Sequence, residues 1–275
     1  MAPSSSPAAT FARGTSFDYP LLLNALGAAR PRFDVVHVAE CSSTNTELLA
    51  RAGRGAASGS VLVCDHQNAG RGRRGRGWVS TPGASLTFSL LWRLPAGTAP
   101  AGLSLAVGVA VARALESLGV SGLTLKWPND IWLARHKLGG ILIEVAPGGD
   151  GLALVIGIGL NLAPDPAWAG RIGQAWTSLA SEGHVLARER VLGAVLGLLA
   201  PALDRFATHG FAACQADWNA RNALRGEPVQ LSSEGETLLG RCGDVSALGE
   251  LELITADGLR LFVGAGDVSL RAQEA

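Results

Sequence analysis

Between residues 123 and 162 the chain alternates apolar runs with turn-forming residues, and this pattern constrains the fold more than any other feature. The apolar runs are LTLKW, IWLAR, KLGGILIEVA and LALVIGIGLNL. Turns are expected between them at Pro128-Asn129-Asp130, at Arg135-His136 and at Pro147-Gly148-Gly149-Asp150. Short apolar runs joined by tight turns pair with their neighbours along the chain. The segment therefore predicts an antiparallel sheet.

Helices and further strands are expected on both sides of this sheet. The predicted helices are residues 17–29, a helix beginning near residue 44, and residues 103–118, 188–209 and 211–223. The helix near residue 44 is expected because Thr44 and Glu47 have the spacing of a capping box. Pro201 is expected to bend the helix at 188–209. Strands are predicted at residues 33–38, 60–65 and 85–93.

After residue 225 the pattern changes to short strands, predicted at residues 229–231, 237–244, 248–254, 259–263 and 268–271. Five strands in under fifty residues suggest a small barrel appended to a larger α+β domain. We therefore expect an N-terminal tail and short helix at 1–30, a catalytic domain at 31–224 and a barrel at 225–275.

The composition is that of a soluble globular protein. Apolar residues make up 48% of the 275 residues, charged residues make up 17%, and the formal net charge is zero. These values argue against a disordered chain or a polybasic nucleic-acid binder. The apolar stretch at 103–112 is too short to cross a bilayer, and the N-terminus lacks the apolar run of a secretory signal. We expect a cytoplasmic protein that does not bind membranes.

Cysteine and lysine usage carries further information. The four cysteines form no CxxC pair and no two histidines have ligand spacing, so no protein-bound metal site is expected. Of the 23 basic residues only Lys126 and Lys137 are lysines, eleven positions apart. Either two positions specifically require lysine or two rare residues cluster by chance.

The loop Gly70-Arg71-Gly72-Arg73-Arg74-Gly75-Arg76-Gly77-Trp78 has four arginines in six positions. The chain has no Asp or Glu between Asp65 and Glu116 that would neutralise them. Glycine lets a backbone approach an anion closely, and guanidinium groups bind carboxylate or phosphate in bidentate fashion. The glycines fit GxGxxG, but no helix start and no acid at the required distance follow, and a P-loop would need GK[ST]. A small-anion site, a nucleic-acid patch and an inert loop all stay open on this loop alone.

Three further motifs contain polar residues in apolar surroundings. KWPND at 126–130 ends a strand in a rigid turn, KLGGILIE at 137–144 begins a strand with paired glycines, and GIGLNL at 157–162 holds one asparagine. Each also has a structural interpretation: a hairpin turn, a β-bulge beside a surface lysine, and an amide that satisfies nearby backbone groups.

In order and spacing, these motifs resemble those of the biotin protein ligases. The set is STN at 43–45, QNAGRGRRGRGW at 67–78, KWPND, KLGGILIE and GIGLNL, and the resemblance extends to about residue 271. It implies an α+β catalytic domain like that of class II aminoacyl-tRNA synthetases, with a mixed or antiparallel sheet, followed by an SH3-like β-barrel. It also implies ATP-dependent activation of biotin to biotinyl-5′-AMP and transfer to a lysine of a biotin carboxyl carrier protein.

The resemblance implies roles for particular residues. Biotin would be bound by Ser43, Thr44, Asn45, Gln67, Arg71, Gly72, Arg73 and Lys137. ATP and the adenylate would be bound by Arg71, Arg73, Trp78, Lys126, Asn129, Asp130 and Asn161. Lys137 and Arg73 would be the catalytic residues, and Mg²⁺ would accompany ATP. Arg74 and Arg76 are undecided between ligand contact and loop structure.

The expected partner is the biotin carboxyl carrier protein of a biotin-dependent carboxylase, and a homodimer formed through sheet edges is conceivable. Only about thirty residues precede the strand at Phe33, so no DNA-binding domain and no DNA partner are expected. A lipoate protein ligase is the nearest alternative, although its RRxSGGG-type loop is absent. An alternative of another class is a single-strand nucleic-acid binder, which the zero net charge and 5% aromatic content disfavour.

Overall fold

The computed structural model describes residues 17–146, 151–168, 172–233, 236–266 and 268–273. Its larger sheet has seven strands in the order β1-β2-β3-β7-β6-β5-β4. The strands are β1 Asp34–Cys41, β2 Ser60–Gln67, β3 Ser85–Leu94, β4 Leu123–Lys126, β5 Asp130–Leu133, β6 His136–Val145 and β7 Leu152–Asn161. Only β1 and β2 pair in parallel, so the sheet is mixed, and the predicted antiparallel meander is confirmed for β4 to β7.

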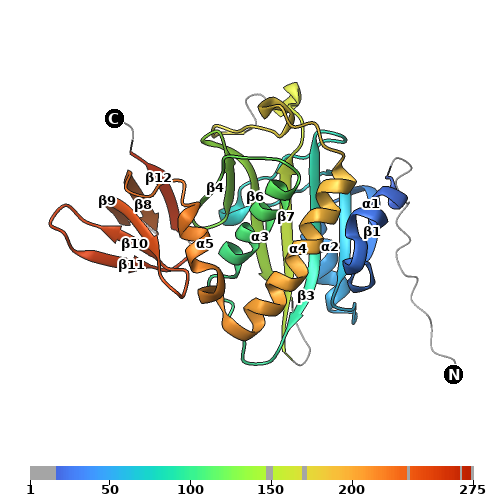
Figure 1. Cartoon of the computed structure of the whole chain (residues 1–275), viewed down its shortest axis with the longest axis horizontal. Helices are drawn as coiled ribbons and strands as arrows, with labels where there is room; N and C mark the ends of the chain where they lie inside the picture. Colours follow the sequence, from blue (N-terminus) through green and yellow to red (C-terminus); the bar gives the residue numbers. More distant parts are fainter. Residues whose placement is uncertain (1–16, 147–150, 169–171, 234–235, 267, 274–275) are drawn as a thin grey trace.

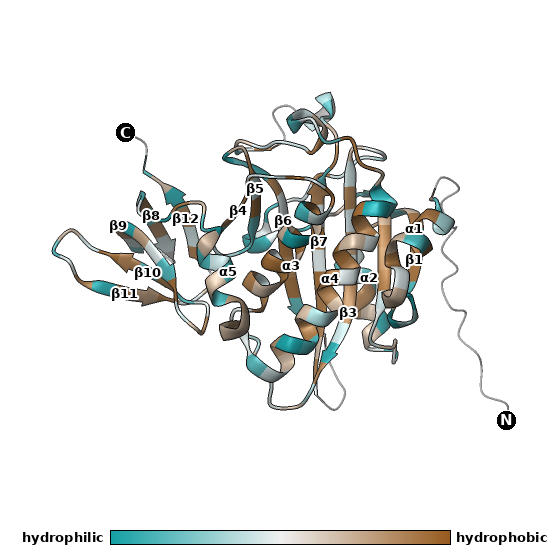
Figure 2. Cartoon of the chain, in the orientation of Figure 1, coloured by the Kyte–Doolittle hydropathy of each residue, from teal (hydrophilic) through white to brown (hydrophobic). Residues whose placement is uncertain are grey.

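The helices cover the two faces of this sheet unequally. α1 Tyr19–Leu26, α3 Leu103–Ser117 and α4 Arg188–His209 belong to the main hydrophobic core, and α3 and α4 cross in front of the sheet in Figure 1. α2 Thr44–Ala52 packs on the opposite face over a smaller apolar cluster. α4 is long and apolar enough to span a membrane, but it packs against α1 and α3 as a core helix. Figure 2 shows the apolar residues concentrated on these packed strands and helices.

The alternation of side chains along the central strands creates a polar face beside α2. On β7, Ile156 and Ile158 enter the main core, whereas Val155 lies in the α2 cluster. Gly157 and Gly159 therefore share the face of Val155, because successive residues of a strand point to opposite sides. The glycine positions leave this face of β7 without side chains, and a cavity can form there.

A second sheet follows the helix α5 Gln215–Ala220. It contains β8 Pro228–Ser233, β9 Glu236–Val245, β10 Leu251–Ile254, β11 Arg260–Val263 and β12 Val268–Ala272, in the order β11-β10-β9-β8-β12. The five predicted strands are present, but over the described residues they form one open sheet and do not close into a barrel. β11 and β12 stand at its two edges.

Other expectations on local structure need correction. The helix α2 begins at Thr44, and its N-cap is Ser43 without a side-chain cap. The predicted Thr44–Glu47 capping box is wrong, because the backbone N–H and the hydroxyl of Thr44 are hydrogen-bonded to Gln67 Oε1. The helix expected at 17–29 ends at Leu26 and continues as a 3₁₀ segment, and the helix expected at 211–223 is shorter. The turn expected at 147–150 lies outside the described residues.

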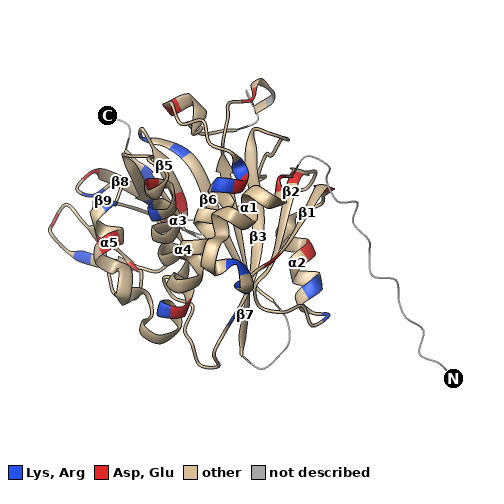
Figure 3. Cartoon of the chain, turned by 45° about the vertical axis from the view of Figure 1, so that its right-hand side comes forward, with Lys and Arg blue, Asp and Glu red and all other residues tan. Residues whose placement is uncertain are grey.

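Charged residues of both signs are scattered over helices and loops (Figure 3). The proposed boundary between residues 224 and 225 falls between α5 and β8. The main hydrophobic core continues across this position, because it includes Leu224 as well as Val229 and Leu231 of β8. The second sheet is therefore held against the larger unit by apolar packing.

Candidate active site

A cavity of about 800 Å³ opens on the polar face of the large sheet. The start of α2, the arginine loop, the strands β3 to β7 and the strand β12 all contribute to its lining. The cavity brings together all of the residues that the sequence singled out for binding or catalysis, which are Ser43, Thr44, Asn45, Gln67, Arg71, Gly72, Arg73, Trp78, Lys126, Asn129, Asp130, Lys137 and Asn161. The two undecided arginines, Arg74 and Arg76, line it as well.

One end of the cavity is a buried cluster of neutral polar groups. Gln67 Oε1 accepts from the backbone N–H of Thr44 at 2.6 Å. Ser89 Oγ lies 2.7 Å from Thr44 Oγ1 and 2.6 Å from Asn45 Oδ1. All four residues are at most 7% exposed. Buried polar groups with this degree of pairing are held in fixed directions, as a site that recognises polar groups on a small ligand requires.

The floor of the cavity depends on the two glycines of β7. A Cβ atom at Gly157 would lie 2.3 Å from Asn45 Oδ1, and one at Gly159 would lie 2.3 Å from the Trp78 ring. The indole of Trp78 therefore sits directly on β7, and its Nε1 donates to Thr87 Oγ1 at 3.3 Å. Any larger residue at either position would displace a side chain that lines the cavity.

The arginine loop is a tight hairpin. Arg71 and Gly77 form an antiparallel bridge, Trp78 N donates to Gly70 O at 2.9 Å, and Gly72 N donates to Arg76 O at 2.7 Å. At the tip, Arg74 and Gly75 have φ values of 57° and 69°. Positive φ at both central residues is the signature of a type I′ turn, in which glycine is favoured at the second central position. The loop is thus a preformed arm that projects over the cavity.

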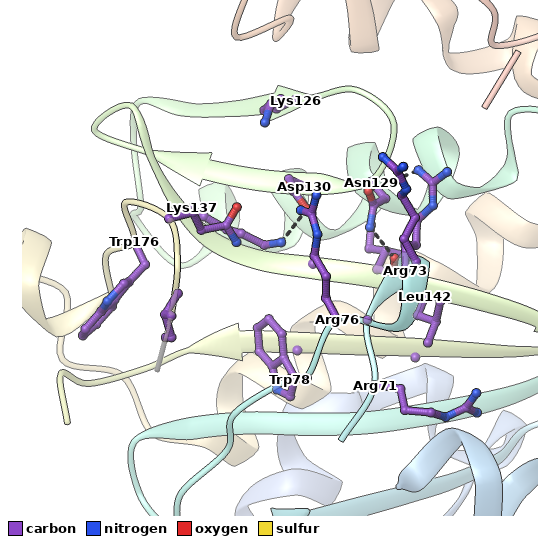
Figure 4. Close-up of a pocket in the computed structure, with 18 of the residues that line it drawn as sticks. Arg71, Arg73, Arg76, Trp78, Lys126, Asn129, Asp130, Lys137, Leu142 and Trp176 are labelled. Atoms are coloured by element: carbon purple, nitrogen blue, oxygen red, sulfur yellow. Dashed lines mark hydrogen bonds and ion pairs between the residues drawn. The ribbon is translucent and has the colours of Figure 1, made fainter. Parts of the chain in front are cut away.

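The arginines of this hairpin have different surroundings. Arg71 Nη2 lies 3.0 Å from the Glu144 carboxylate on β6 and 3.3 Å from Thr46 Oγ1. Arg73 Nη1 lies 3.5 Å from Asn129 Oδ1, and its Nη2 donates to the carbonyls of Ala265, at 2.8 Å, and Gly266. Arg76 extends toward Asp130 (Figure 4). Arg73 thereby joins the loop to the segment that precedes β12.

The other end of the cavity carries the two lysines. Lys137 Nζ lies 2.7 Å from Asp130 Oδ1, and Figure 4 shows this pair facing Arg76. Lys126 Nζ lies 5.1 Å from the centre of the Trp132 ring, a cation–π geometry. Burial lowers the pKa of Lys126, and the nearby positive charges of Lys137 and Arg76 act in the same direction, against the opposing effect of Asp130. Three cations and one carboxylate leave this end net positive, which suits a polyanion.

Asn161 is only 4% exposed and has a structural contact within the site. Its Nδ2 donates to Thr177 O at 2.9 Å and lies 3.4 Å from Lys137 O. The amide therefore connects the end of β7 to the segment that holds Trp176, which forms a bridge with Lys137. The sequence left open whether this amide satisfies nearby backbone groups, and the structure shows that it does so.

Several residues of the site were not predicted from the sequence. Trp176 lines the cavity near Lys137 (Figure 4), and Ser89, Thr87 and Glu144 support it. Ser89 and Thr87 were detectable, because they are polar residues at alternate positions of an apolar strand. For Trp176 no local pattern in the sequence distinguishes it from a core tryptophan.

Comparison with known proteins identifies the family. The Biotin/lipoate A/B protein ligase family matches residues 38–161. The bifunctional ligase/repressor BirA of Escherichia coli is 37% identical over 234 residues, which are 84% of this chain and 72% of that protein. The biotin–[acetyl-CoA-carboxylase] ligase of Mycobacterium tuberculosis is 35% identical over 250 residues, which are 88% of this chain and 90% of that protein.

A solved structure agrees with this relationship. The biotin protein ligase from Aquifex aeolicus in complex with biotin and ATP superposes with a TM-score of 0.74 at 29% identity, covering 87% of this chain and 99% of that one. On these relationships of sequence and fold, this chain belongs to the biotin protein ligases of the biotin/lipoate A/B protein ligase family.

Proposed function

We propose that this chain is an ATP-dependent ligase that activates biotin as biotinyl-5′-AMP and transfers the biotinyl group to a lysine of a biotin carboxyl carrier protein. The observation that carries the proposal is a single cavity with two chemically different ends. A buried neutral cluster around Thr44 and Gln67 suits the polar head of biotin, and a cationic end around Lys137 suits phosphates. The names of the relatives, one of them an acetyl-CoA-carboxylase ligase, support the same activity and carrier.

In the first step a carboxylate oxygen of biotin attacks the α-phosphorus of ATP, and the bond from that phosphorus to the bridging oxygen of pyrophosphate breaks. Both reactants are anions, so positive charge fixed around them lowers the barrier. We assign Lys137 to the reacting carboxylate and α-phosphate, because its ammonium is a compact charge held in place by Asp130. Arg73, held beside the tip of the hairpin by Asn129, is assigned to the same phosphate.

In the second step the amine of the carrier lysine attacks the acyl carbon of biotinyl-5′-AMP. The bond from that carbon to the phosphate oxygen breaks, AMP leaves, and the amine gives up a proton. The adenylate must be kept from water until the carrier arrives. The arginine hairpin projects over the cavity and is held by Arg71 and Arg73 at different points, which supports its assignment as the cover.

Mg²⁺ is proposed to enter with ATP. Among the described residues no group of three or more His, Cys, Asp or Glu could hold a metal ion. The cavity lining nevertheless supplies a carboxylate at Asp130. That carboxylate is paired with Lys137 at 2.7 Å. Mg²⁺ bound to ATP takes most of its ligands from phosphate oxygens and water, so the metal is assigned to ATP and not to Asp130.

A comparison of biotin with lipoate identifies the acid that the protein uses. Purified protein is incubated with ATP, Mg²⁺ and a carrier domain, and with either radiolabelled biotin or radiolabelled lipoate. We expect label on the carrier with biotin only, together with biotin-dependent release of pyrophosphate. Transfer of lipoate but not biotin to the carrier would show that the protein is a lipoate ligase. If neither acid is transferred and the protein binds single-stranded nucleic acid, the ligase assignment is wrong.

Partners and location complete the proposal. β1 and β4 stand at the two ends of the large sheet, but the outer side of β4 is already bonded at Leu125 to Arg221 and Ala223. Pairing of β1 edges between two chains would give a homodimer, which sedimentation measurements would detect. A cytoplasmic location is proposed because ATP and a carboxylase carrier are its substrates, and the described cysteines are all free thiols. DNA and membranes are not among the proposed partners.

A further inference from the structure

Glu144 connects the neutral cluster of the cavity to the arginine hairpin. It lies near the end of β6, opposite Val155 of β7, and its side chain is 24% exposed. Its carboxylate accepts from Asn45 Nδ2 at 2.7 Å and from Arg71 Nη2 at 3.0 Å. Asn45 belongs to the neutral cluster, and Arg71 belongs to the arginine hairpin. One carboxylate thus contacts both the pocket and its cover.

The contact with Asn45 fixes the direction of that amide. Its Nδ2 faces two acceptors, the Glu144 carboxylate and Leu142 O at 3.2 Å, and its Oδ1 faces Ser89 Oγ at 2.6 Å. The same amide fills the space beside Gly157, where a Cβ atom would lie 2.3 Å from Asn45 Oδ1. A carboxylate can only accept hydrogen bonds, so a rotated amide would place two acceptors against each other.

The fixed amide in turn sets the direction of the hydroxyl groups. Ser89 and Thr44 have two hydroxyl protons for three close oxygen contacts, which are Thr44 with Gln67, Thr44 with Ser89, and Ser89 with Asn45. Asn45 Oδ1 cannot donate, so the Ser89 hydroxyl donates to it, and the Thr44 hydroxyl donates to Gln67 Oε1 at 3.0 Å. Gln67 Oε1 then accepts from both the backbone N–H and the hydroxyl of Thr44, which leaves the Gln67 Nε2 donor for the ligand.

The contact with Arg71 fixes the hairpin. Arg71 is bridged to Gly77 across the hairpin, so an anchor on Arg71 restrains both strands of the loop. The sequence has no acid between Asp65 and Glu116, and Glu144 supplies the missing negative charge from a distant strand. Without this anchor the cover would open more often, and water would reach the mixed anhydride.

We propose that Glu144 is a positioning residue that couples the biotin pocket to closure of the arginine hairpin. The proposal rests on the proposed function, because it concerns retention of the adenylate that this function forms. Glu144 sets the hydrogen-bond direction that Gln67 presents to the ligand, and through Arg71 it keeps the hairpin closed over the product of the first step.

The test compares Glu144→Gln, Glu144→Ala and a matched control, Glu116→Gln. The control breaks an Arg–Glu pair of similar length, between Glu116 and Arg221, away from the cavity. The measurements are KM for biotin, kcat for pyrophosphate release, and the number of AMP molecules formed for each biotin transferred to the carrier. Glu144→Gln removes the charge but keeps an oxygen acceptor for Asn45, so it separates the two contacts.

Glu144→Ala is expected to raise KM for biotin on the order of tenfold and to raise the AMP-to-transfer ratio severalfold. Glu144→Gln is expected to raise the AMP-to-transfer ratio while KM for biotin stays within about twofold of the unchanged protein. Glu116→Gln should change neither quantity. Thermal melting of each variant shows whether it is folded, and the milder Glu144→Gln keeps the test open if Glu144→Ala is not.

Two outcomes would overturn the coupling. One is an AMP-to-transfer ratio in both Glu144 variants equal to that of the unchanged protein. The other is equal effects of the Glu144 and Glu116 substitutions, which would indicate only a loss of stability. If the unchanged protein transfers no biotin at all, the proposed function itself fails, and the inference about Glu144 falls with it.

Discussion

Replacement of Lys137 by alanine tests the charge arrangement of the cavity most directly. The Lys137 ammonium lies 2.7 Å from Asp130 Oδ1, and the two side chains are 17% and 14% exposed. The substitution removes a donor to the transition state, which usually costs a factor on the order of 10²–10³ in rate. It also uncovers a carboxylate. For an anion placed about 7 Å from that charge, an effective dielectric constant of about 20 gives a repulsion of about 2 kcal/mol.

The two effects can be separated by a second substitution. Biotin-dependent release of pyrophosphate is measured for Lys137→Ala and for Lys137→Ala combined with Asp130→Asn. The single variant should lose at least on the order of 10²-fold in rate. Neutralising Asp130 should recover roughly thirtyfold, because each 1.4 kcal/mol of the roughly 2 kcal/mol repulsion corresponds to a factor of ten. Ordinary pyrophosphate release by the single variant would refute the assignment of Lys137, and a further loss in the double variant would refute the repulsion argument.

Three other substitutions test particular contacts. Gly159→Ala places a Cβ about 2.3 Å from the Trp78 ring, so we expect a loss of about 1–3 kcal/mol in unfolding free energy and altered tryptophan fluorescence. Arg74→Asn should leave adenylation within about twofold and keep or raise the melting temperature, because asparagine tolerates the φ of 57° better. Burial lowers the pKa of Lys126 below the ordinary 10.5, so its charge is present at low pH and lost as pH rises through that pKa. KM for ATP should therefore rise on the alkaline side, and Lys126→Arg should move this rise to higher pH; an unchanged pH profile would contradict the role.

The strands were predictable because their residues alternate between two environments. In β3, Phe88 and Leu90 are buried in the main core, whereas the alternate residues Thr87 and Ser89 are bonded on the other face to Trp78 and Asn45. The period-two pattern contains this information within a few residues. No local sequence pattern of this kind indicates whether the second sheet closes into a barrel. Whether β11 and β12 pair is decided by contacts between distant strands, and spacing alone cannot reveal them.

The motifs that form the site could be predicted from the sequence, but the hydrogen-bond and ion-pair partners of their residues could not. The capping-box spacing of Thr44 and Glu47 is a local pattern, and it failed because Gln67, from another strand, takes the Thr44 donors. Glu144 is the last residue of KLGGILIE, yet its partners Asn45 and Arg71 lie 99 and 73 positions away in the chain. Local patterns thus identify which residues reach a site, and tertiary pairing decides what each one does there.

The arginine loop shows the same distinction within eight residues. Its four guanidinium groups look equivalent in sequence, but a two-residue turn at Arg74 and Gly75 sends the two strands of the hairpin to opposite ends of the cavity. Arg71 is directed to Glu144 beside the neutral cluster, and Arg76 is directed to Asp130 beside the lysines. A hairpin with this geometry can contact both substrates at once. Its turn, rather than its charge alone, is therefore the feature that makes the loop suitable for joining a carboxylate to a phosphate.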